Sequence, residues 1–295
     1  MNISSNRWAA RKIAGGGFIT GAILLTGIVA PAQNLFMTTY GYDVYEFTPS
    51  GQTSTFASGM LDCTGVAFNS AGDLFVASGD QQNITEFTPG GGKSTFASVP
   101  QPVGMAINPA GALFTSDYSG GKITETTPGG MSSTFASGLS EPYGMAFNNA
   151  GNLFVTEFSA GKVLEITPGG TQSTFASGLT HPSGLAFDSV GDLFVSNEGN
   201  GIITEITAAG VASTFATGLS DPDGLAFNSA GDLFEGDSSS GHIYEFTPSG
   251  VKSTFAAGYI DAGFIAFQPA PEPSVWGLLA MGATAMLIRR GRGRG

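Results

Sequence analysis

Short apolar runs alternate with turn-forming residues along most of the chain. In residues 184–217, the runs GLAF, LFVSN, IITEIT and VASTFAT are separated by DSVGD, a short loop and AAG. The runs are rich in Val, Ile, Phe and Thr, and the segments between them supply Gly, Asp, Asn and, elsewhere in the chain, Pro. Since this alternation is typical of strands joined by tight turns, it predicts an all-β fold.

The set of four runs occurs six times along the chain. The Phe of a repeated TFA string falls at Phe56, Phe96, Phe135, Phe175, Phe215 and Phe255. A repeated Leu-Phe pair begins at Leu35, Leu74, Leu113, Leu153, Leu193 and Leu233. Four strands in about 40 residues make one blade of a propeller. The sequence therefore predicts a six-bladed β-propeller with four antiparallel strands per blade, in which the TFA phenylalanines pack blade against blade.

The two ends of the repeat region are complementary. The first copy starts at Asn34 without the GxAF strand, and the last copy ends with that strand at 263–267. We therefore expect the C-terminal strand to join the first blade and close the ring, which leaves no sheet edge open at the seam. An open solenoid, the alternative for repeated units, does not need complementary ends.

The N-terminal segment has the three parts of an export signal. Three basic residues precede the apolar run IAGGGFITGAILLTGIVAPA, which ends in the small residues Ala30-Pro31-Ala32. These parts predict a signal peptide over 1–32 with cleavage before Gln33. A retained membrane anchor is the alternative. The propeller is expected over 33–270.

The C-terminal segment 271–295 also has three parts. Pro271-Glu272-Pro273 is followed by an apolar run over 274–288 and then by arginines that begin with Arg289 and Arg290. This tail resembles the PEP-CTERM sorting signal. The resemblance implies a Gram-negative bacterial protein that is transiently anchored in the membrane, cut by an exosortase-type enzyme and delivered to the cell surface or extracellular matrix. A plain C-terminal anchor is the alternative.

Charge narrows the classes of partner. Between residues 32 and 274 the chain carries four lysines against all 23 acidic residues, a formal charge of 4 − 23 = −19. Such a surface would repel a phosphate backbone, which argues against nucleic-acid binding, and it would attract cations or basic partners. The one cysteine, Cys63, stands where other copies have Pro and cannot form an intramolecular disulfide.

One phrase of the repeat resembles known families. The pattern P-x-G-h-A-F-x-x-x-G-x-L-F-V, as in residues 182–195, is similar to NHL repeats and to gluconolactonase-like (regucalcin-like, SMP-30) and streptogramin-lyase-like propellers. The resemblance covers residues 34–267. It implies the propeller architecture rather than one activity.

Divergence between copies points to one face. Loops between strands 1 and 2 and between strands 3 and 4 are nearly uniform, whereas loops between strands 2 and 3 and between successive blades vary. We call the two sets the uniform face and the variable face, and we expect function on the variable face. Its acidic residues are Asp43, Asp62, Asp80, Asp117, Glu141, Glu157, Glu198, Asp221, Asp223, Glu235, Asp237 and Asp261.

Two rings of residues are expected around the channel on that face. The ends of the second strands give Thr39, Ser78, Asp117, Glu157, Asn197 and Asp237. The positions before the strand-1 glycines give Thr64, Val103, Tyr143, Ser183, Asp223 and Ala262. Clustered oxygen ligands suit Ca²⁺, which makes Asp223 and Asp237 candidate metal ligands, with Asn197, Glu157, Asp117, Asp221 and His181 as further ligand candidates. In the alternative interpretation these acids only cap turns, and His181 is a solvated loop residue.

The gluconolactonase resemblance offers a partial match. It implies a metal ligand at the Asp of Pro222-Asp223-Gly224, but no strand-1 Gly here follows an Asn. The sequence therefore favours an exported, surface-sorted, non-catalytic propeller that binds an extracellular polysaccharide, surface protein or cation through its acidic variable face. A calcium-dependent lactonase or hydrolase centred on Asp223, Asp237, Glu157 and Asn197 is the alternative, and a purely structural role in a surface matrix is a third hypothesis.

Overall fold

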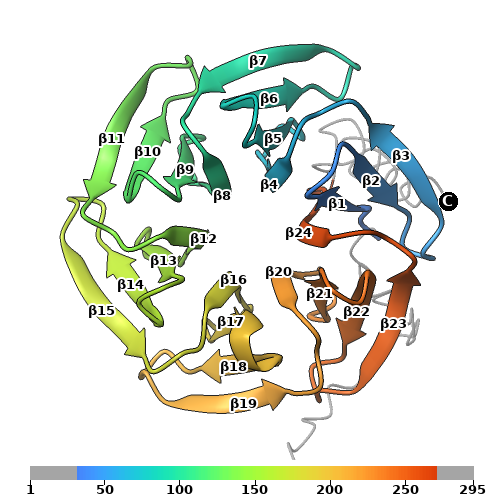
Figure 1. Ribbon diagram of the computed structural model, residues 1–295, viewed down its shortest axis with the longest axis vertical. Helices are drawn as coiled ribbons and strands as arrows, with labels where there is room; N and C mark the ends of the chain where they lie inside the picture. The colour runs from blue at the N-terminus through green and yellow to red at the C-terminus, as the bar shows by residue number, and fades with distance from the viewer. Residues whose placement is uncertain (1–31, 271–295) are drawn as a thin grey trace, which may run out of the picture.

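A computed structural model describes residues 32–270 as a closed ring of six four-stranded antiparallel sheets (Figure 1). This confirms the predicted six-bladed β-propeller. The predicted signal peptide, apart from Ala32, and the predicted sorting tail lie outside the described residues. Within residues 32–270, no helix is long and apolar enough to cross a membrane.

Each blade runs from an inner strand at the channel to an outer strand at the rim. Blade 1 is β24 (Ala262–Phe267), β1 (Leu35–Thr39), β2 (Val44–Phe47) and β3 (Thr53–Ala57). Blades 2 and 3 are β4 (Cys63–Phe68), β5 (Leu74–Ser78), β6 (Asn83–Phe87) and β7 (Lys93–Ser98), then β8 (Pro102–Ile107), β9 (Leu113–Asp117), β10 (Lys122–Thr126) and β11 (Ser132–Ser137). Blades 4 and 5 are β12 (Pro142–Phe147), β13 (Leu153–Glu157), β14 (Lys162–Ile166) and β15 (Gln172–Ser177), then β16 (Pro182–Phe187), β17 (Leu193–Asn197), β18 (Ile202–Ile206) and β19 (Ala212–Ala216), with a short 3₁₀ helix, η1 (Glu198–Asn200), after β17. Blade 6 is β20 (Pro222–Phe227), β21 (Leu233–Asp237), β22 (His242–Phe246) and β23 (Lys252–Ala257).

The seam of the ring lies in blade 1. β24 pairs antiparallel with β1, so the last strand of the propeller completes the blade that the first strand begins (Figure 1). Beyond the strands, the amide of Gln268 donates to the carbonyl of Asn34 at 2.9 Å, and the side chain of Gln33 donates to the carbonyl of Gln268 at 2.9 Å. The predicted closure is confirmed.

The register of β24 corrects one alignment of the repeat. Ile265 lies opposite Met37, at the register that the hydrophobic residue of the GxAF strand has in the other blades. The ring position in this strand therefore belongs to Gly263 and not to Ala262. Phe264 consequently stands where the other five copies have Gly.

Glycine is required at that position because the inner strands converge on the channel. A Cβ atom added at Gly104 would collide with the carbonyl oxygen of Tyr143 in the next blade, and one at Gly144 would collide with that of Ser183. An L side chain in these strands would push the neighbouring blades apart. Only the last strand carries a side chain there, that of Phe264.

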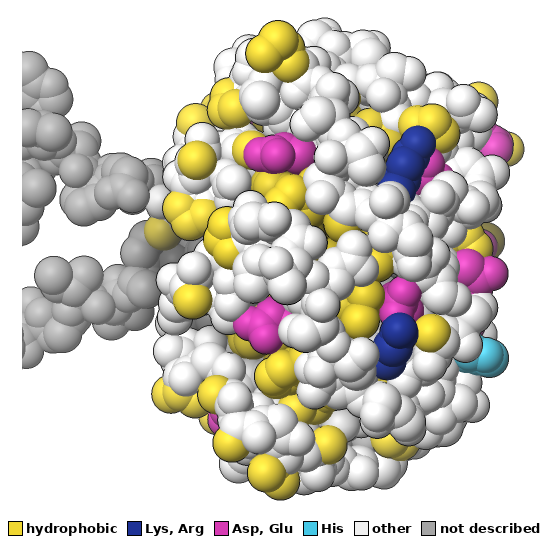
Figure 2. Space-filling view, turned by 90° about the vertical axis from the view of Figure 1, so that its left-hand side faces the viewer, with side chains coloured by type: hydrophobic (Ala, Val, Ile, Leu, Met, Phe, Trp, Pro, Cys, Tyr) yellow, Lys and Arg dark blue, Asp and Glu magenta, His cyan; other side chains and the backbone are white. Residues whose placement is uncertain are grey.

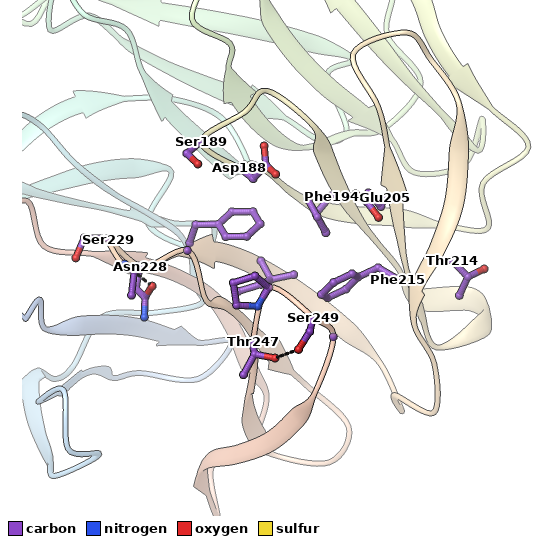
Figure 3. A pocket seen from close by; sticks show the side chains of 16 residues that line it. Asp188, Ser189, Phe194, Glu205, Thr214, Phe215, Asn228, Ser229, Thr247 and Ser249 are labelled. Carbon is purple, nitrogen blue, oxygen red and sulfur yellow. Dashed lines mark hydrogen bonds between the residues drawn. The ribbon is translucent and has the colours of Figure 1, made fainter. Parts of the chain in front are cut away.

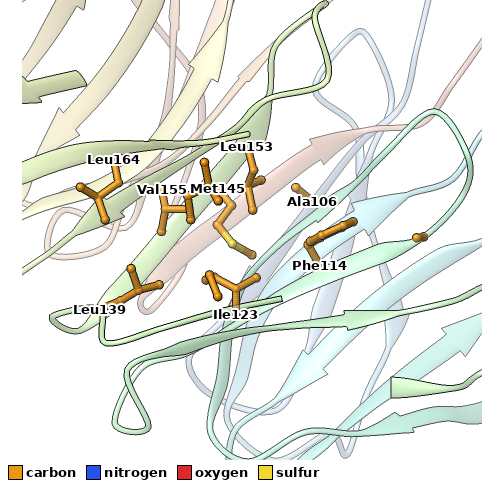
Figure 4. Packing of buried hydrophobic residues seen from close by; sticks show 11 residues of the cluster. Ala106, Phe114, Ile123, Leu139, Met145, Leu153, Val155 and Leu164 are labelled. Carbon is orange, nitrogen blue, oxygen red and sulfur yellow. The ribbon is translucent and has the colours of Figure 1, made fainter. Parts of the chain in front are cut away.

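Triplets of phenylalanine join the blades at five of the six boundaries, and Ile107 replaces the third phenylalanine between blades 2 and 3. A β-bulge in β11 turns the TFA residue Phe135 inward, where its ring centroid lies 4.9 Å from that of Phe114 in an edge-to-face arrangement. Phe114 also packs edge-to-face on Phe147 of blade 4, at 5.0 Å. Figure 4 shows Phe114 beside Ile123 and Met145 in the cluster between these blades. Aromatic contacts at this separation are favourable, and the predicted blade-to-blade role of the TFA residues is confirmed.

We predict that Phe114→Ala lowers the free energy of unfolding by about 3–5 kcal/mol, because it removes the ring that both neighbours contact and leaves a cavity between blades. Urea unfolding followed by far-UV circular dichroism measures the change. Val190→Ala, in an exposed turn, is the matched control and should stay within about 0.5 kcal/mol of the parent. A loss at Phe114 as small as that of the control would contradict the packing argument.

Candidate functional site

One pocket lies on the uniform face between blades 5 and 6. It measures about 660 Å³, and Figure 3 shows Asp188 and Asn228 on its two sides with Phe215 between the blades. Smaller pockets of about 360 and 210 Å³ lie at equivalent blade boundaries, among the same turns and phenylalanines. Because similar grooves occur at several blade boundaries, we assign this groove to the scaffold rather than to a specific site.

A different pocket lies on the variable face, at the mouth of the channel. It measures about 370 Å³. Its lining residues are Tyr40, Tyr143, Glu198, Asp221, Asp223, Ser238 and Asp261. They come from blades 1, 4, 5 and 6 and from the loops that lead into them, so this pocket, unlike the grooves, is built from positions at which the copies differ. We call it the mouth pocket.

Backbone hydrogen bonds fix the loops that bear these residues. In each blade the first residue after the second strand donates its amide to the carbonyl of the residue that precedes the inner strand. Glu198 donates to His181 at 3.1 Å, and Ser238 donates to Asp221 at 3.0 Å. Each bond holds one residue of a strand 2–3 loop and one residue of an inter-blade loop at the same edge of the channel. The first residue after strand 2 therefore faces the mouth.

The side chains one residue earlier, at the ends of the second strands, have a different role. Glu157 accepts a hydrogen bond from the amide of Ser140 at 2.6 Å, and Asn197 accepts one from the amide of Thr180 at 3.2 Å. These side chains are buried inside their own blades and hold the inter-blade loops. The expected ring around the channel at this position is therefore corrected, and these side chains cap turns.

Asp237 repeats this arrangement, whereas Asp117 caps the loop that follows its own strand. The two carboxylate oxygens of Asp237 accept from the amides of Ser220 at 2.7 Å and Ser240 at 2.9 Å. Asp117 accepts from the amide of Gly120 at 2.8 Å and also pairs with Lys122. In residues 32–270, no group of three or more His, Cys, Asp or Glu side chains is placed to hold a metal ion. The structure does not bring Asp237 and Asp223 together as ligands of one ion.

The remaining candidates do lie at the mouth. Asp221 and Asp223 line the mouth pocket. His181 is exposed at the rim, as expected of a loop residue, and its ring stacks on Phe158 with centroids 4.7 Å apart and an angle of 10° between planes.

An aromatic cluster spans the channel at the mouth pocket. Tyr143 reaches across from blade 4 and stacks on Phe264 of blade 1, with centroids 5.5 Å apart. The hydroxyl of Tyr143 is hydrogen-bonded to that of Tyr40, which donates to Asp223 of blade 6. Phe158 packs on the other side of Tyr143, at 5.7 Å. Side chains from three blades thus meet at the centre of the ring.

The sequence analysis placed Tyr143 at the channel but missed its aromatic partners, although a signal was present. Tyr40, Tyr118 and Phe158 occupy the same place in the repeat, the first residue after strand 2, where the other copies have Gly, Glu or Ser. An aromatic residue at one loop position in three of six copies marks a shared environment. Phe264 was missed because the alignment on Gly263 placed it within an ordinary inner strand.

Burial dominates the electrostatics of the mouth pocket. Asp223 is only 4% exposed, and its Oδ1 atom has no hydrogen-bond partner among the described residues. Burial raises the pKa of Asp223 to about 7; the hydrogen bond from Tyr40 opposes this rise, and the charges of Glu198 and Asp221 add to it. Burial, followed by the charge of Asp221, raises the pKa of Glu198 to about 7. Both carboxyls therefore titrate near neutrality.

Glu235 is a third unusual carboxyl. It was expected on the acidic surface of the variable face, but it is 0% exposed, and neither of its oxygens has a partner among the described residues. Burial, followed by the charges of Asp237 and Asp223, raises its pKa well above the ordinary value. The copies have Met, Val or Thr at this place in the second strand. Glu235 thus replaces a core residue in blade 6.

Cys63 carries no comparable chemistry. Its side chain is 1% exposed, and burial raises the pKa of the thiol to about 12, followed by the charges of Asp62 and Asp43. A thiol in this environment stays protonated and is a poor nucleophile.

Comparisons with known proteins show the fold. No family model matches the chain, and no curated protein matches it. A chain of a nidogen–laminin complex is similar with a TM-score of 0.73 and 17% identity over 81% of this chain and 99% of that one. A catalytically inactive virginiamycin B lyase from Staphylococcus aureus with quinupristin has a TM-score of 0.62 and 15% identity over 80% of this chain and 92% of that one. A candidate gluconolactonase has a TM-score of 0.61 and 17% identity over 72% of this chain and 90% of that one. The chain is thus a six-bladed propeller with structural neighbours of the NHL and gluconolactonase-like type.

The raised pKa values predict how stability depends on pH. Because the native state keeps Asp223 and Glu198 protonated up to about pH 7 while the unfolded chain releases these protons near pH 4, the free energy of unfolding should fall as pH rises through this window. Asp223→Asn removes the cost of burying the charge. It should raise the melting temperature at about pH 8 by roughly 5–10 °C and change it little at about pH 4.

Thermal unfolding by circular dichroism across this pH range measures the effect. Asp80→Asn removes one charge from an exposed position of the same face and is the matched control. If both variants keep the pH dependence of the parent, Asp223 does not have a raised pKa.

Proposed function

We propose that this protein is an exported, surface-sorted, non-catalytic propeller whose mouth pocket binds a saccharide residue of an extracellular polysaccharide. The observation that carries this proposal is the convergence of aromatic rings and carboxyls from four blades on one pocket, at positions where the repeat does not dictate the residue. Aromatic rings pack on the apolar faces of sugars, and carboxyl oxygens accept hydrogen bonds from hydroxyl groups. Pockets of this kind combine an apolar wall with a few placed polar groups.

The charge distribution supports a local site rather than a broad electrostatic surface. Figure 2 shows a few acidic side chains on the side wall, two of them beside lysines, among uncharged and apolar groups. Lys122 and Lys162 each pair with an acid, at 3.4 and 2.8 Å. In the described part of the chain, neither lysine nor arginine lines the mouth pocket. Acidic groups are therefore concentrated without compensation at the channel mouth.

The proposal of surface sorting rests on the two end segments. The basic and apolar N-terminal residues and the Pro-Glu-Pro, apolar and arginine-rich C-terminal residues have the order of an export signal and of a PEP-CTERM tail. The exosortase-type enzyme that recognises such tails would be the processing partner. A surface location would place the mouth pocket among extracellular polysaccharides.

We do not extend the proposal to the metal-dependent lactonase. Asp237, Asn197 and Glu157, which that hypothesis required, hold loops by accepting backbone hydrogen bonds. Of the four residues, only Asp223 lines the mouth pocket.

Processing can be tested in a Gram-negative host that has an exosortase-type enzyme. We expect the mature chain to begin at Gln33 and to end near Pro271, as measured by intact mass and N-terminal sequencing of the surface fraction. Replacing Arg289 and Arg290 by Gln should retain the chain in the membrane fraction, because these charges hold the tail on the cytoplasmic side. Full-length protein in the cytoplasm would contradict the proposal.

Binding can be tested with an array of extracellular bacterial polysaccharides, followed by calorimetry of the oligosaccharides that bind. We expect Tyr143→Ala to weaken binding by about tenfold or more, because it removes the ring that forms the floor of the pocket. Tyr42→Ala is the matched control, since Tyr42 is 61% exposed on the same face and does not line the pocket. Equal losses in both variants, or no saccharide bound, would refute the proposed site.

A further inference from the structure

The mouth pocket has an unbalanced charge. Of its seven lining residues, four are carboxylic acids: Glu198, Asp221, Asp223 and Asp261. The lining holds no basic side chain and no histidine from the described residues. A neutral sugar would satisfy hydrogen-bonding groups here, but it would leave this charge uncompensated.

One acceptor in the pocket lacks a donor. Asp223 is 4% exposed, its Oδ2 atom accepts from Tyr40, and its Oδ1 atom is buried without a partner among the described residues. A buried acceptor without a donor costs free energy, and the cost is larger when the group is charged. A ligand that brings an N–H donor with positive charge would remove both costs at once.

The aromatic floor suits the same ligand. Tyr40 and Tyr143 line the pocket next to the carboxyls, and Phe264 supports Tyr143 from the opposite side of the channel. Cations are attracted to the faces of aromatic rings, and the attraction grows when the site is desolvated. The pocket therefore offers acceptors on one side and ring systems on the other.

We propose that the mouth pocket binds a primary ammonium group whose N–H donates to Asp223, while Glu198 and Asp221 nearby supply compensating negative charge. Combined with the proposed function, on which this step rests, the ligand class is an amino sugar with a free amine. A quaternary ammonium has no N–H to donate, so it would leave Oδ1 unsatisfied. Calcium needs six to eight oxygen ligands, and the described residues bring no three acidic or imidazole groups to one point.

Paired probes isolate the ammonium group. Calorimetry of the mature chain at about pH 7.5, where carboxyls with a pKa near 7 are mostly ionised, would compare the glucosamine tetramer with the N-acetylglucosamine tetramer. In the second tetramer an uncharged acetamide replaces each basic amine of the first. Glucosamine itself, tetramethylammonium and calcium are the further probes. We expect the free-amine tetramer to bind at least about tenfold more tightly than the acetylated one, as for a charge-assisted hydrogen bond.

Two variants test the residues. Asp223→Asn and Glu198→Gln should each remove most of the advantage of the free amine, whereas Asp80→Asn, which removes an exposed charge outside this pocket, should keep it. Near-UV circular dichroism would confirm that each variant is folded. Equal affinity for both tetramers, or an advantage that survives Asp223→Asn, would overturn the inference. Stoichiometric calcium binding that is lost in Asp223→Asn would overturn it in favour of a metal site.

The outcomes also separate this inference from the proposed function. If neutral oligosaccharides bind in a manner that depends on Tyr143 while the free amine gives no advantage, the saccharide site stands and the ammonium inference fails. If glucosamine and other small primary amines bind through Asp223 while no polysaccharide binds, the ammonium site stands and the saccharide function fails.

Discussion

The pairing of β24 with β1 is the constraint on which the rest of the molecule depends. Without it, blade 1 would lack its inner strand, and both blades at the seam would expose apolar surface. The register of this pairing also decides which side chain enters the channel. Glycines at the seam make room for the backbone of β24. A Cβ at Gly224 would lie 2.6 Å from the Cα of Phe264, and one at Gly236 would lie 2.5 Å from the carbonyl oxygen of Gly263. The pairing that closes the ring therefore also places Phe264 in the aromatic cluster.

The mouth is asymmetric although the scaffold is sixfold. Aromatic residues follow the second strand in blades 1, 3 and 4, and Glu198 and Ser238 follow it in blades 5 and 6. The same backbone bond presents all of them, so the residue at this position sets the chemistry of each side. Uniform turns on the opposite face preserve the geometry while the mouth varies. A repeat protein can in this way change its ligand without changing its blades.

The fold could be predicted because each copy repeats the same strands and turns, and because the complementary ends specify closure. The site could be predicted only in part. Asp223 was found from its place before a glycine, but Asp237, Asn197 and Glu157 resemble metal ligands in sequence while backbone amides already occupy their oxygens. Sequence does not show which acceptor meets an amide one loop away. The role of Phe264 could be predicted only with the register of β24, because a shift of one residue moves every side chain of a strand to its other face.

Two residues of blade 6 that depart from the repeat, Glu235 and Asp223, destabilise the scaffold. Glu235 buries a carboxyl where other copies place Met, Val or Thr, and Asp223 buries a second one with an unsatisfied oxygen. Each such group costs free energy that an apolar residue would not. The scaffold does not require them, since the remaining blades are built without them. Asp223 also lines the mouth pocket, so its presence is best explained by what the pocket binds, because a bound cation would return part of the free energy that its burial costs.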